Sequence, residues 1–153
     1  MRVMGLDVGK KRIGVAVSDE LGITAQPLKH INRASIDKDM EEILSVADDY
    51  AVEKIIVGVP YNMDGSVGPQ ARAAVKFMEA LREKTGKYVE GWDERLSTVA
   101  VERVLIEGDV SRGKRKGVVD KLAAAYILQG WLERRSCREP ARPAGGPSRT
   151  AGE

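Results

Sequence analysis

Three acidic groups in this sequence of 153 residues have the types and spacing needed for chemistry. Asp7 interrupts the apolar run VMGLDVG, Asp93 and Glu94 close the run YVEGWDE, and Asp120 directly precedes the run KLAAAYIL. One histidine and one cysteine are too few for a histidine-rich or thiolate-rich zinc site. Any metal would therefore be held by oxygen, and carboxylates suit Mg²⁺ or Mn²⁺.

This donor set indicates a class of reaction. Mg²⁺ and Mn²⁺ keep coordination positions open for water and for phosphate oxygens. Two such ions about 3.5 to 4 Å apart activate a water and stabilise the leaving oxygen of a phosphodiester. The acids therefore predict a metal-dependent nuclease site made by Asp7, Asp120 and one member of the pair Asp93 and Glu94.

Each acid also has a structural interpretation. A carboxylate inside a central strand costs several kcal/mol unless it is paired, protonated or bound to a metal, and the basic turn at 10–12 could neutralise Asp7. An acid in a first helical turn, where Asp120 is expected, is stabilised by the helix dipole by about 0.3 to 1 kcal/mol. Successive strand residues point to opposite faces, so only one of Asp93 and Glu94 can share the face of Asp7.

A polyanionic substrate would require basic side chains around these acids. Arg95 follows the acidic pair, where it could bind nucleic acid or form an ion pair with one of the two acids. The other candidate contacts form two clusters, one in the first turn and one before Asp120: Lys10, Lys11 and Arg12, and then Arg112, Lys114, Arg115 and Lys116. The loop 61–68 is a further candidate: it could contact RNA as a mobile loop beside the site, or it is an ordinary connection.

Hydrophobic periodicity predicts the elements that position these residues. The order of elements predicts an α/β fold with an antiparallel hairpin on one side of the sheet and parallel strands on the other. In such sheets, ligands bind beyond the carboxyl ends of the parallel strands. The expected strands are 3–9, 13–19, 24–31 (with Pro27 at an edge or bulge), 54–60 and 88–94; the expected helices are 35–51, 69–86, 97–107 and 118–135, with a basic loop at 111–117.

Composition indicates one domain followed by a tail. Residues 136–153 contain three of the six prolines and cannot bury enough apolar surface to fold, so we expect a domain over 1–135 and a disordered tail over 136–153. The net charge of +2 does not by itself indicate a nucleic-acid-binding protein. No apolar run approaches the roughly 20 residues of a membrane span, and the start MRVMGLDVGKKR lacks the apolar core of a signal peptide. We therefore expect a cytoplasmic protein.

Four segments in succession resemble the motifs of the YqgF family. They are DVGKKRIGVAVSD at 7–19, VGVPYNMDGSVGPQA at 57–71, WDERLST at 92–98 and VVDKLAAAYILQGWL at 118–132. This family comprises bacterial ribonuclease H-like proteins described as Holliday junction resolvases and as pre-16S rRNA nucleases. The resemblance spans nearly all of residues 1–135.

The resemblance implies a ribonuclease H-like fold with a mixed five-stranded sheet. It also implies a nuclease that acts on the 5′ end of a ribosomal RNA precursor, with an acidic site at Asp7, Asp93, Glu94 and Asp120 and with Mg²⁺ or Mn²⁺ as cofactor. Within the pair we favour Glu94 as the metal ligand beside Asp7 and Asp120, because its longer side chain reaches further from the strand end. We expect a monomer or a weak homodimer.

Three alternatives remain open. Resolvases of this fold carry a further acid one turn into the last helix, whereas the residue three after Asp120 is Ala123, so cleavage of branched DNA is the second candidate. The DVG turn also resembles the first phosphate-binding element of actin-like and sugar-kinase ATPases, but those enzymes need two lobes, and 153 residues supply one. A non-catalytic RNA-binding module is the third, and Asp7 in the sheet centre argues against it.

Overall fold

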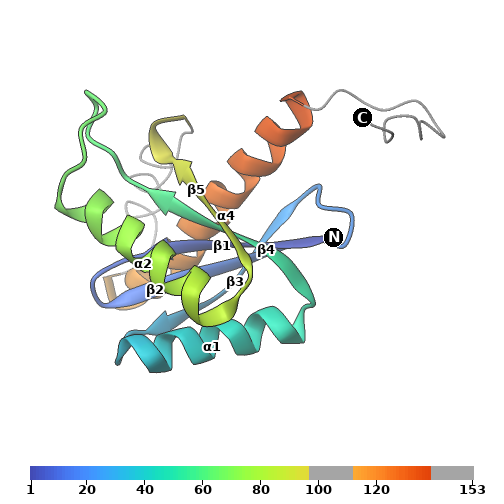
Figure 1. Ribbon diagram of the computed structural model, residues 1–153, viewed down its shortest axis with the longest axis horizontal. Helices are drawn as coiled ribbons and strands as arrows, with labels where there is room; N and C mark the ends of the chain where they lie inside the picture. Colours follow the sequence, from blue (N-terminus) through green and yellow to red (C-terminus); the bar gives the residue numbers. More distant parts are fainter. Residues whose placement is uncertain (97–111, 139–153) are drawn as a thin grey trace.

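A mixed five-stranded sheet forms the centre of the fold (Figure 1). The computed structural model describes residues 1–96 and 112–138, and the side chains of residues 112–119 and 136–138 lie outside the description. The strand order is β3-β2-β1-β4-β5, with antiparallel pairing among the first three strands and parallel pairing of β1 with β4 and of β4 with β5. The predicted α/β architecture is confirmed. The elements are β1 (Arg2–Val8), β2 (Arg12–Ser18), β3 (Ala25–Asn32), α1 (Ile36–Asp49), β4 (Val52–Val59), α2 (Pro69–Thr85), β5 (Tyr88–Asp93), the 3-10 helix η1 (Glu94–Leu96) and α4 (Arg112–Arg138).

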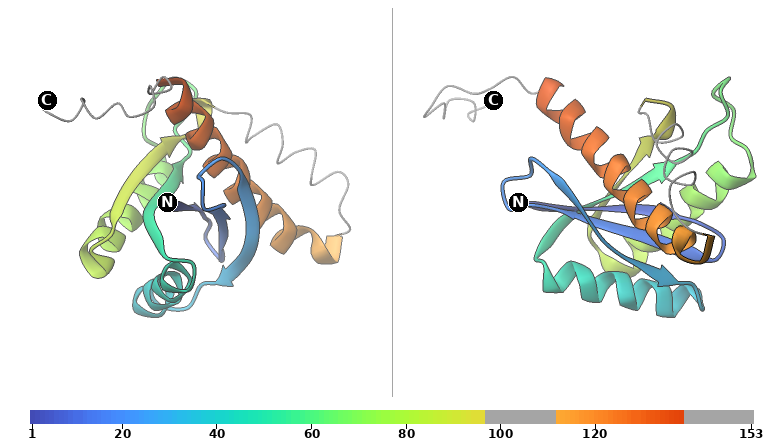
Figure 2. Two further views of the ribbon diagram at one scale, coloured as in Figure 1. Left: turned by 90° about the vertical axis from the view of Figure 1, so that its right-hand side faces the viewer. Right: turned by 180° about the vertical axis from the view of Figure 1, so that it is seen from behind.

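Helices cover both faces of this sheet (Figures 1 and 2). Alternate residues of β1 divide between two cores, because side chains along a strand point to opposite faces. Met4 and Leu6 pack beneath α1 and α2, whereas Val3 packs with Ile56 and Leu128 beneath α4. β1 is therefore the strand from which both layers are built, and its far end carries Asp7.

Glycines allow α4 to lie directly on the sheet. A Cβ atom added to Gly5 in β1 would lie 2.7 Å from Cβ of Leu128, and one added to Gly14 in β2 would overlap the backbone of Asp120. One added to Gly58 in β4 would overlap Ile127. At Gly5 and Gly14 the backbone of α4 lies directly on the strand, and at Gly58 the Ile127 side chain fills the space, so the three glycines set the height of α4 above the sheet.

Ordinary capping residues mark three of the ends of α1 and α2. Oγ of Ser35 accepts a hydrogen bond of 3.2 Å from the N–H of Lys38 and caps α1. Pro69 begins α2, and Gly86 ends it in the left-handed conformation with a φ of 69°. Ala51, which directly follows the C-cap of α1, has a φ of 53° without being glycine. Pro27 lies opposite Ala16 in the edge strand β3, at a shift of register, as predicted for a proline in a sheet.

The start of α4 differs from the prediction. We expected a basic loop over 111–117 and a helix from Val118, but the helix begins at Arg112. Gly113 and Gly117 suggested a loop, whereas lysine and arginine are good helix formers that extend a helix already stabilised by packing. Asp120 therefore lies beyond the first turn, and the helix dipole does not explain it.

The end of α4 also extends past the expected boundary. The helix runs to Arg138, three residues beyond the domain end expected at Arg135. The helix expected over 97–107, and residues 139–153 of the expected tail, lie outside the described residues. In the part of the chain that the structure describes, no helix combines the length and apolarity needed to cross a lipid bilayer.

Candidate active site

Asp7 and Asp120 lie on the same face of the sheet. Asp7 pairs in register with Gly14 of the antiparallel strand β2, and directly opposed residues project from the same face. A Cβ atom on Gly14 would meet the backbone of Asp120, so that shared face is the one covered by α4. Asp7 is half-buried there, one residue before the end of β1.

Glu94 joins this face from the other side of β1. It is the first residue of η1, directly after β5, whose carboxyl end lies at the same sheet edge as that of β1 because the strands are parallel. Oε2 of Glu94 lies 2.7 Å from the position that a Cβ on Gly58 would occupy. Gly58 also faces Ile127 of α4, so the Glu94 carboxylate lies over the α4 face of the sheet.

Asp93 projects from the opposite face. Its register partner in β4 is Val59, which packs in the core beneath α1 and α2. The Asp93 carboxylate accepts hydrogen bonds from the backbone N–H of Arg95 at 2.9 Å and from Nη2 of Arg95 at 2.7 Å. These contacts hold the pKa of Asp93 below its ordinary value. Asp93, counted among the catalytic candidates from sequence, is therefore committed to an ion pair away from the Asp7 face.

Asp120 is paired with a basic residue of the first hairpin. Nε of Arg12 donates a hydrogen bond of 2.9 Å to Oδ2 of Asp120, and the two side chains are 23% and 21% exposed. Arg12 thus forms an ion pair with a candidate metal ligand, and its contact with nucleic acid remains a prediction. Lys10 and Lys11, in the turn before it, are exposed.

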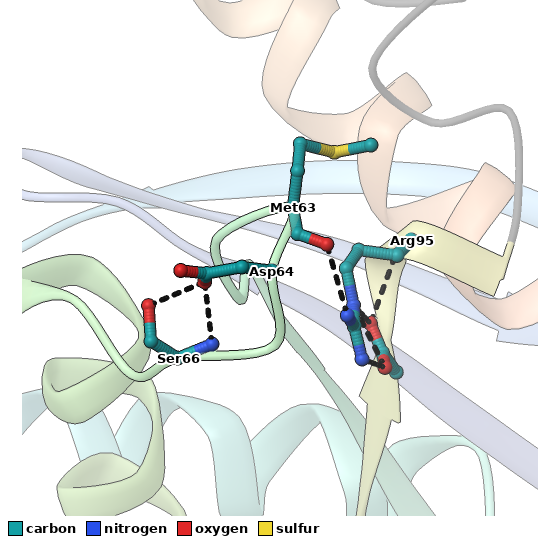
Figure 3. Close-up of polar contacts among 5 residues, drawn as sticks. Met63, Asp64, Ser66 and Arg95 are labelled. Atoms are coloured by element: carbon teal, nitrogen blue, oxygen red, sulfur yellow. Dashed lines mark hydrogen bonds and ion pairs between the residues drawn. The ribbon is translucent and has the colours of Figure 1, made fainter.

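Arg95 is held by the loop between β4 and α2 (Figure 3). Nη1 of Arg95 donates a hydrogen bond of 3.3 Å to the carbonyl oxygen of Met63, and the guanidinium lies 5.7 Å from the centre of the Tyr61 ring. The hydrogen bonds and charge of Asp93, together with the nearby Asp64 and Tyr61, raise the pKa of Arg95 above its ordinary value. The guanidinium predicted to contact nucleic acid thus connects η1 to the loop.

The donor set fits a hard divalent cation in its chemistry, because Asp7, Glu94 and Asp120 offer only carboxylate oxygens. The acids are spread apart on this face, however. Among the side chains described, no three histidine, cysteine, aspartate or glutamate residues gather closely enough to hold a metal ion together. The three acids share a face, but Asp120 is engaged by Arg12 at one side of it.

The second basic cluster lies at the same end of the sheet as the first turn. Figures 1 and 2 show the beginning of α4 at the end of the sheet where the turn joins β1 to β2. Arg112, Lys114, Arg115 and Lys116 are in that part of the helix, and their side chains lie outside the described residues. The backbone places both basic segments at one end of the sheet, and their contact with nucleic acid remains a prediction.

An ion pair that sequence reasoning missed supports the first turn. Nη1 of Arg33 donates a hydrogen bond of 2.9 Å to the carbonyl oxygen of Gly9, and its Nε lies 3.3 Å from Oδ2 of Asp39. Asp39 is 2% exposed and also accepts a hydrogen bond from the N–H of Ala34. A signal was present in the sequence, because Asp39 falls at helical spacing with the apolar residue Ile43 and so requires a partner.

Comparison with known proteins identifies the family. The family described as RuvX, Holliday junction resolvase, matches residues 1–134. The chain belongs to the RuvX family. The resemblance that the four motifs indicated is thereby confirmed.

Curated relatives of this RuvX protein share most of its length. A protein of Desulforamulus reducens is 56% identical over 133 residues, which are 87% of this chain and 97% of that protein, and is named "Putative pre-16S rRNA nuclease". A protein of Halothermothrix orenii with the same name is 58% identical over 132 residues, which are 86% of this chain and 94% of that protein.

The fold of this RuvX protein is also found in a solved structure. The RuvC of Thermus thermophilus in complex with a Holliday junction substrate superimposes with a TM-score of 0.55 at 15% identity. The match covers 89% of this chain and 97% of RuvC. The predicted ribonuclease H-like fold is confirmed by this likeness, which at such low identity concerns the fold alone.

Proposed function

We propose that this RuvX protein is a divalent-metal-dependent nuclease that hydrolyses phosphodiester bonds in RNA. The observation that carries the proposal is the placement of three carboxylates, Asp7, Glu94 and Asp120, on one face of the sheet near the carboxyl ends of parallel strands. Ligands of open α/β sheets bind at that edge. The exposed Lys10 and Lys11 lie at the same edge and supply positive charge for a polyanion.

The proposed substrate is the 5′ end of the pre-16S ribosomal RNA. Relatives more than 50% identical over nearly their whole length carry the name of a pre-16S rRNA nuclease, which supports this choice. Branched DNA is the second candidate, supported by the description of the family. The position one turn after Asp120 is Ala123, which is buried, so it supplies no further acid of the kind expected in a resolvase.

The proposal assigns Mg²⁺ or Mn²⁺ to Asp7, Glu94 and Asp120, which share a face of the sheet and would have to approach one another to share one ion. When bound, the cation supplies an activated water and stabilises the leaving oxygen. The chain supplies the rest of the site. Gly14 lets the α4 backbone at Asp120 approach the sheet, and Gly58 leaves space for the Glu94 carboxylate. The Arg12 guanidinium balances the charge of Asp120, and Lys10 and Lys11 attract and orient the phosphate backbone.

The cellular setting follows from the substrate. Ribosomal RNA precursors of bacteria are transcribed and trimmed in the cytoplasm, so the proposal places the protein there. It requires no partner subunit for the three acids, which come from one chain, in keeping with the expected monomer or weak homodimer.

A cleavage assay with the full chain tests the proposal. Substrates are RNA carrying the 5′ leader of pre-16S rRNA, an RNA duplex and a four-way DNA junction, each with Mg²⁺, Mn²⁺ or EDTA. We expect cleavage of the leader RNA that EDTA abolishes and that Asp7→Asn reduces by orders of magnitude. Asp49→Asn, which changes an exposed acid of α1, is the matched control. Cleavage of the junction alone would favour the DNA candidate, and cleavage that Asp7→Asn leaves intact would overturn the assignment of the site.

A further inference from the structure

The loop between β4 and α2, residues 61–68, presents an apolar side chain beside the candidate site. Met63 is 87% exposed, more than any other large hydrophobic residue described. In Figure 3 its side chain is directed away from Asp64 and Ser66. Figure 1 shows that this loop projects beyond the end of the sheet. A single exposed apolar residue is ordinary on a protein surface, so the case depends on what surrounds Met63.

The backbone that carries Met63 is braced by hydrogen bonds within the loop. The N–H of Asn62 donates to the carbonyl oxygen of Ser66 at 3.0 Å, and the N–H of Gly65 donates to the carbonyl oxygen of Asn62 at 2.8 Å. Oδ1 of Asp64 accepts from the N–H of Ser66 at 2.9 Å and from its hydroxyl at 2.6 Å. These hydrogen bonds fold residues 62–66 into a compact turn that supports the backbone of Met63.

Arg95 connects this turn to the acidic face. Its guanidinium donates to the carbonyl oxygen of Met63 itself and pairs with Asp93, while the residue before Arg95 is Glu94. The contacts of Arg95 with the Met63 carbonyl and with Asp93 therefore hold Met63 close to the backbone of Glu94. Two more exposed apolar residues flank the same junction, Val67 in the loop and Leu96 in η1.

We infer that Met63 contacts the face of an unstacked base in single-stranded RNA close to the scissile phosphate. Apolar side chains, methionine among them, insert between bases, and single-stranded segments are the parts of RNA whose bases are free to be splayed out. The surrounding charge favours nucleic acid over a protein partner, because the exposed Lys10 and Lys11 lie at the same end of the sheet. This inference rests on the proposed function and narrows its substrate to RNA that is unpaired at the cleavage point.

An introduced indole reports the contact directly. The native tryptophans, Trp92 and Trp131, are 6% and 5% exposed, so Met63→Trp adds an exposed fluorophore to a buried background. Leu21→Trp is the matched control, because Leu21 is also exposed and lies in the turn between β2 and β3, beyond the amino-terminal end of β1. Both variants are made with Asp7→Asn, so that Mg²⁺ can be present while the RNA stays intact.

The expected result is saturable quenching by a short single-stranded oligoribonucleotide in Met63→Trp and none in Leu21→Trp. Half-maximal quenching should occur at the RNA concentration that half-saturates the anisotropy of labelled RNA, and the matching RNA duplex should quench less. In the parent chain, Met63→Ala should weaken RNA binding about fivefold, toward the low end of the range for base stacking, whereas Met63→Leu should retain the affinity.

The outcomes separate this inference from the nuclease proposal. Binding by anisotropy without selective quenching at position 63 would overturn the role of Met63 and leave the nuclease proposal standing. Equal quenching by duplex and single strand would overturn the unpaired base as ligand. If neither the variants nor the parent chain bind RNA, the inference about Met63 and the proposal of an RNA substrate fail together.

Discussion

Nε of Arg12 lies 2.9 Å from Oδ2 of Asp120, joining residues 108 positions apart in the sequence. The contact ties the first hairpin to α4 across the face that carries Asp7 and Glu94. Both side chains are mostly buried, where water screens their electrostatic attraction less than at the surface. A cation bound to Asp120 has to share that carboxylate with the guanidinium.

Arg12→Gln should therefore tighten Mn²⁺ binding by several-fold, because it removes the positive charge that competes for Asp120. Isothermal titration of Mn²⁺ into the full chain measures this. The same variant should be less stable without metal by about 1 to 3 kcal/mol, since the Asp120 carboxylate loses a charged partner. Lys11→Gln, which removes a neighbouring exposed charge, is the control and should change either quantity little. Weaker Mn²⁺ binding in Arg12→Gln would show instead that Arg12 positions Asp120 for the metal.

Asp7→Asn should keep the fold and lose the stabilisation by metal. The substitution preserves shape while removing a charged ligand, so the rise in melting temperature that Mg²⁺ gives the parent chain should largely disappear. Without metal the variant should be at least as stable as the parent, because one of several acids on the same face is neutralised. Thermal denaturation with Mg²⁺ and with EDTA measures both. A metal-independent loss of roughly 3 to 5 kcal/mol would indicate a buried ion pair in place of a metal site.

Asp39→Ala should be strongly destabilising, by about 3 to 5 kcal/mol, because it leaves the Arg33 guanidinium and the Ala34 N–H without their buried acceptor. Chemical denaturation of the full chain measures the loss. Asp37→Ala is the matched control in the same turn of α1: its pair with Lys84 is exposed, and its loss should cost less than about 1 kcal/mol. Similar losses in the two variants would show that the buried position of Asp39 does not matter.

The ion pair of Asp93 with Arg95 should make the free energy of unfolding depend on pH in the acidic range. The pKa of Asp93 is lowered in the folded protein, chiefly by the hydrogen bond from the Arg95 side chain. The stabilisation is therefore complete above the unfolded pKa of about 3.9 and is lost as the pH falls through the folded value. The difference in free energy of unfolding between the parent and Asp93→Asn should be constant from neutral pH down to about pH 5 and shrink below about pH 4. A difference that is unchanged down to the lowest pH measured would contradict the assignment.

Ala51→Gly should stabilise the protein. A non-glycine residue in the left-handed region costs about 1 kcal/mol or more, and Ala51 has a φ of 53°. Part of the gain is offset because glycine makes the unfolded chain more flexible, so we expect a net increase of about 0.5 to 1 kcal/mol in the free energy of unfolding. Ala73→Gly, at an exposed position inside α2, should have the opposite sign.

Sequence reasoning located the acids and their strands because both signals are local. The apolar run around Asp7 and the motif spacing need no knowledge of distant contacts. The pairing of Arg12 with Asp120 was out of reach, since it depends on where α4 crosses β2. That crossing depends in turn on Gly14, whose missing side chain is informative only when the helix above it is known. For Arg95 the sequence left two roles open, because a basic residue beside acids can bind a ligand or form an ion pair, and the structure shows the ion pair with Asp93.

The placement of the three acids also determines when they can act. Asp7 and Glu94 belong to elements that are synthesised before α4, the last element described, which brings Asp120 and covers the face holding Val3 and Ile56. A nascent chain whose α4 has not yet been synthesised has the first two acids on an uncovered sheet and lacks the third. Under the proposed assignment, translation itself delays activity: a nascent copy stays inert toward the RNA around it until α4 has been made and has packed on the sheet.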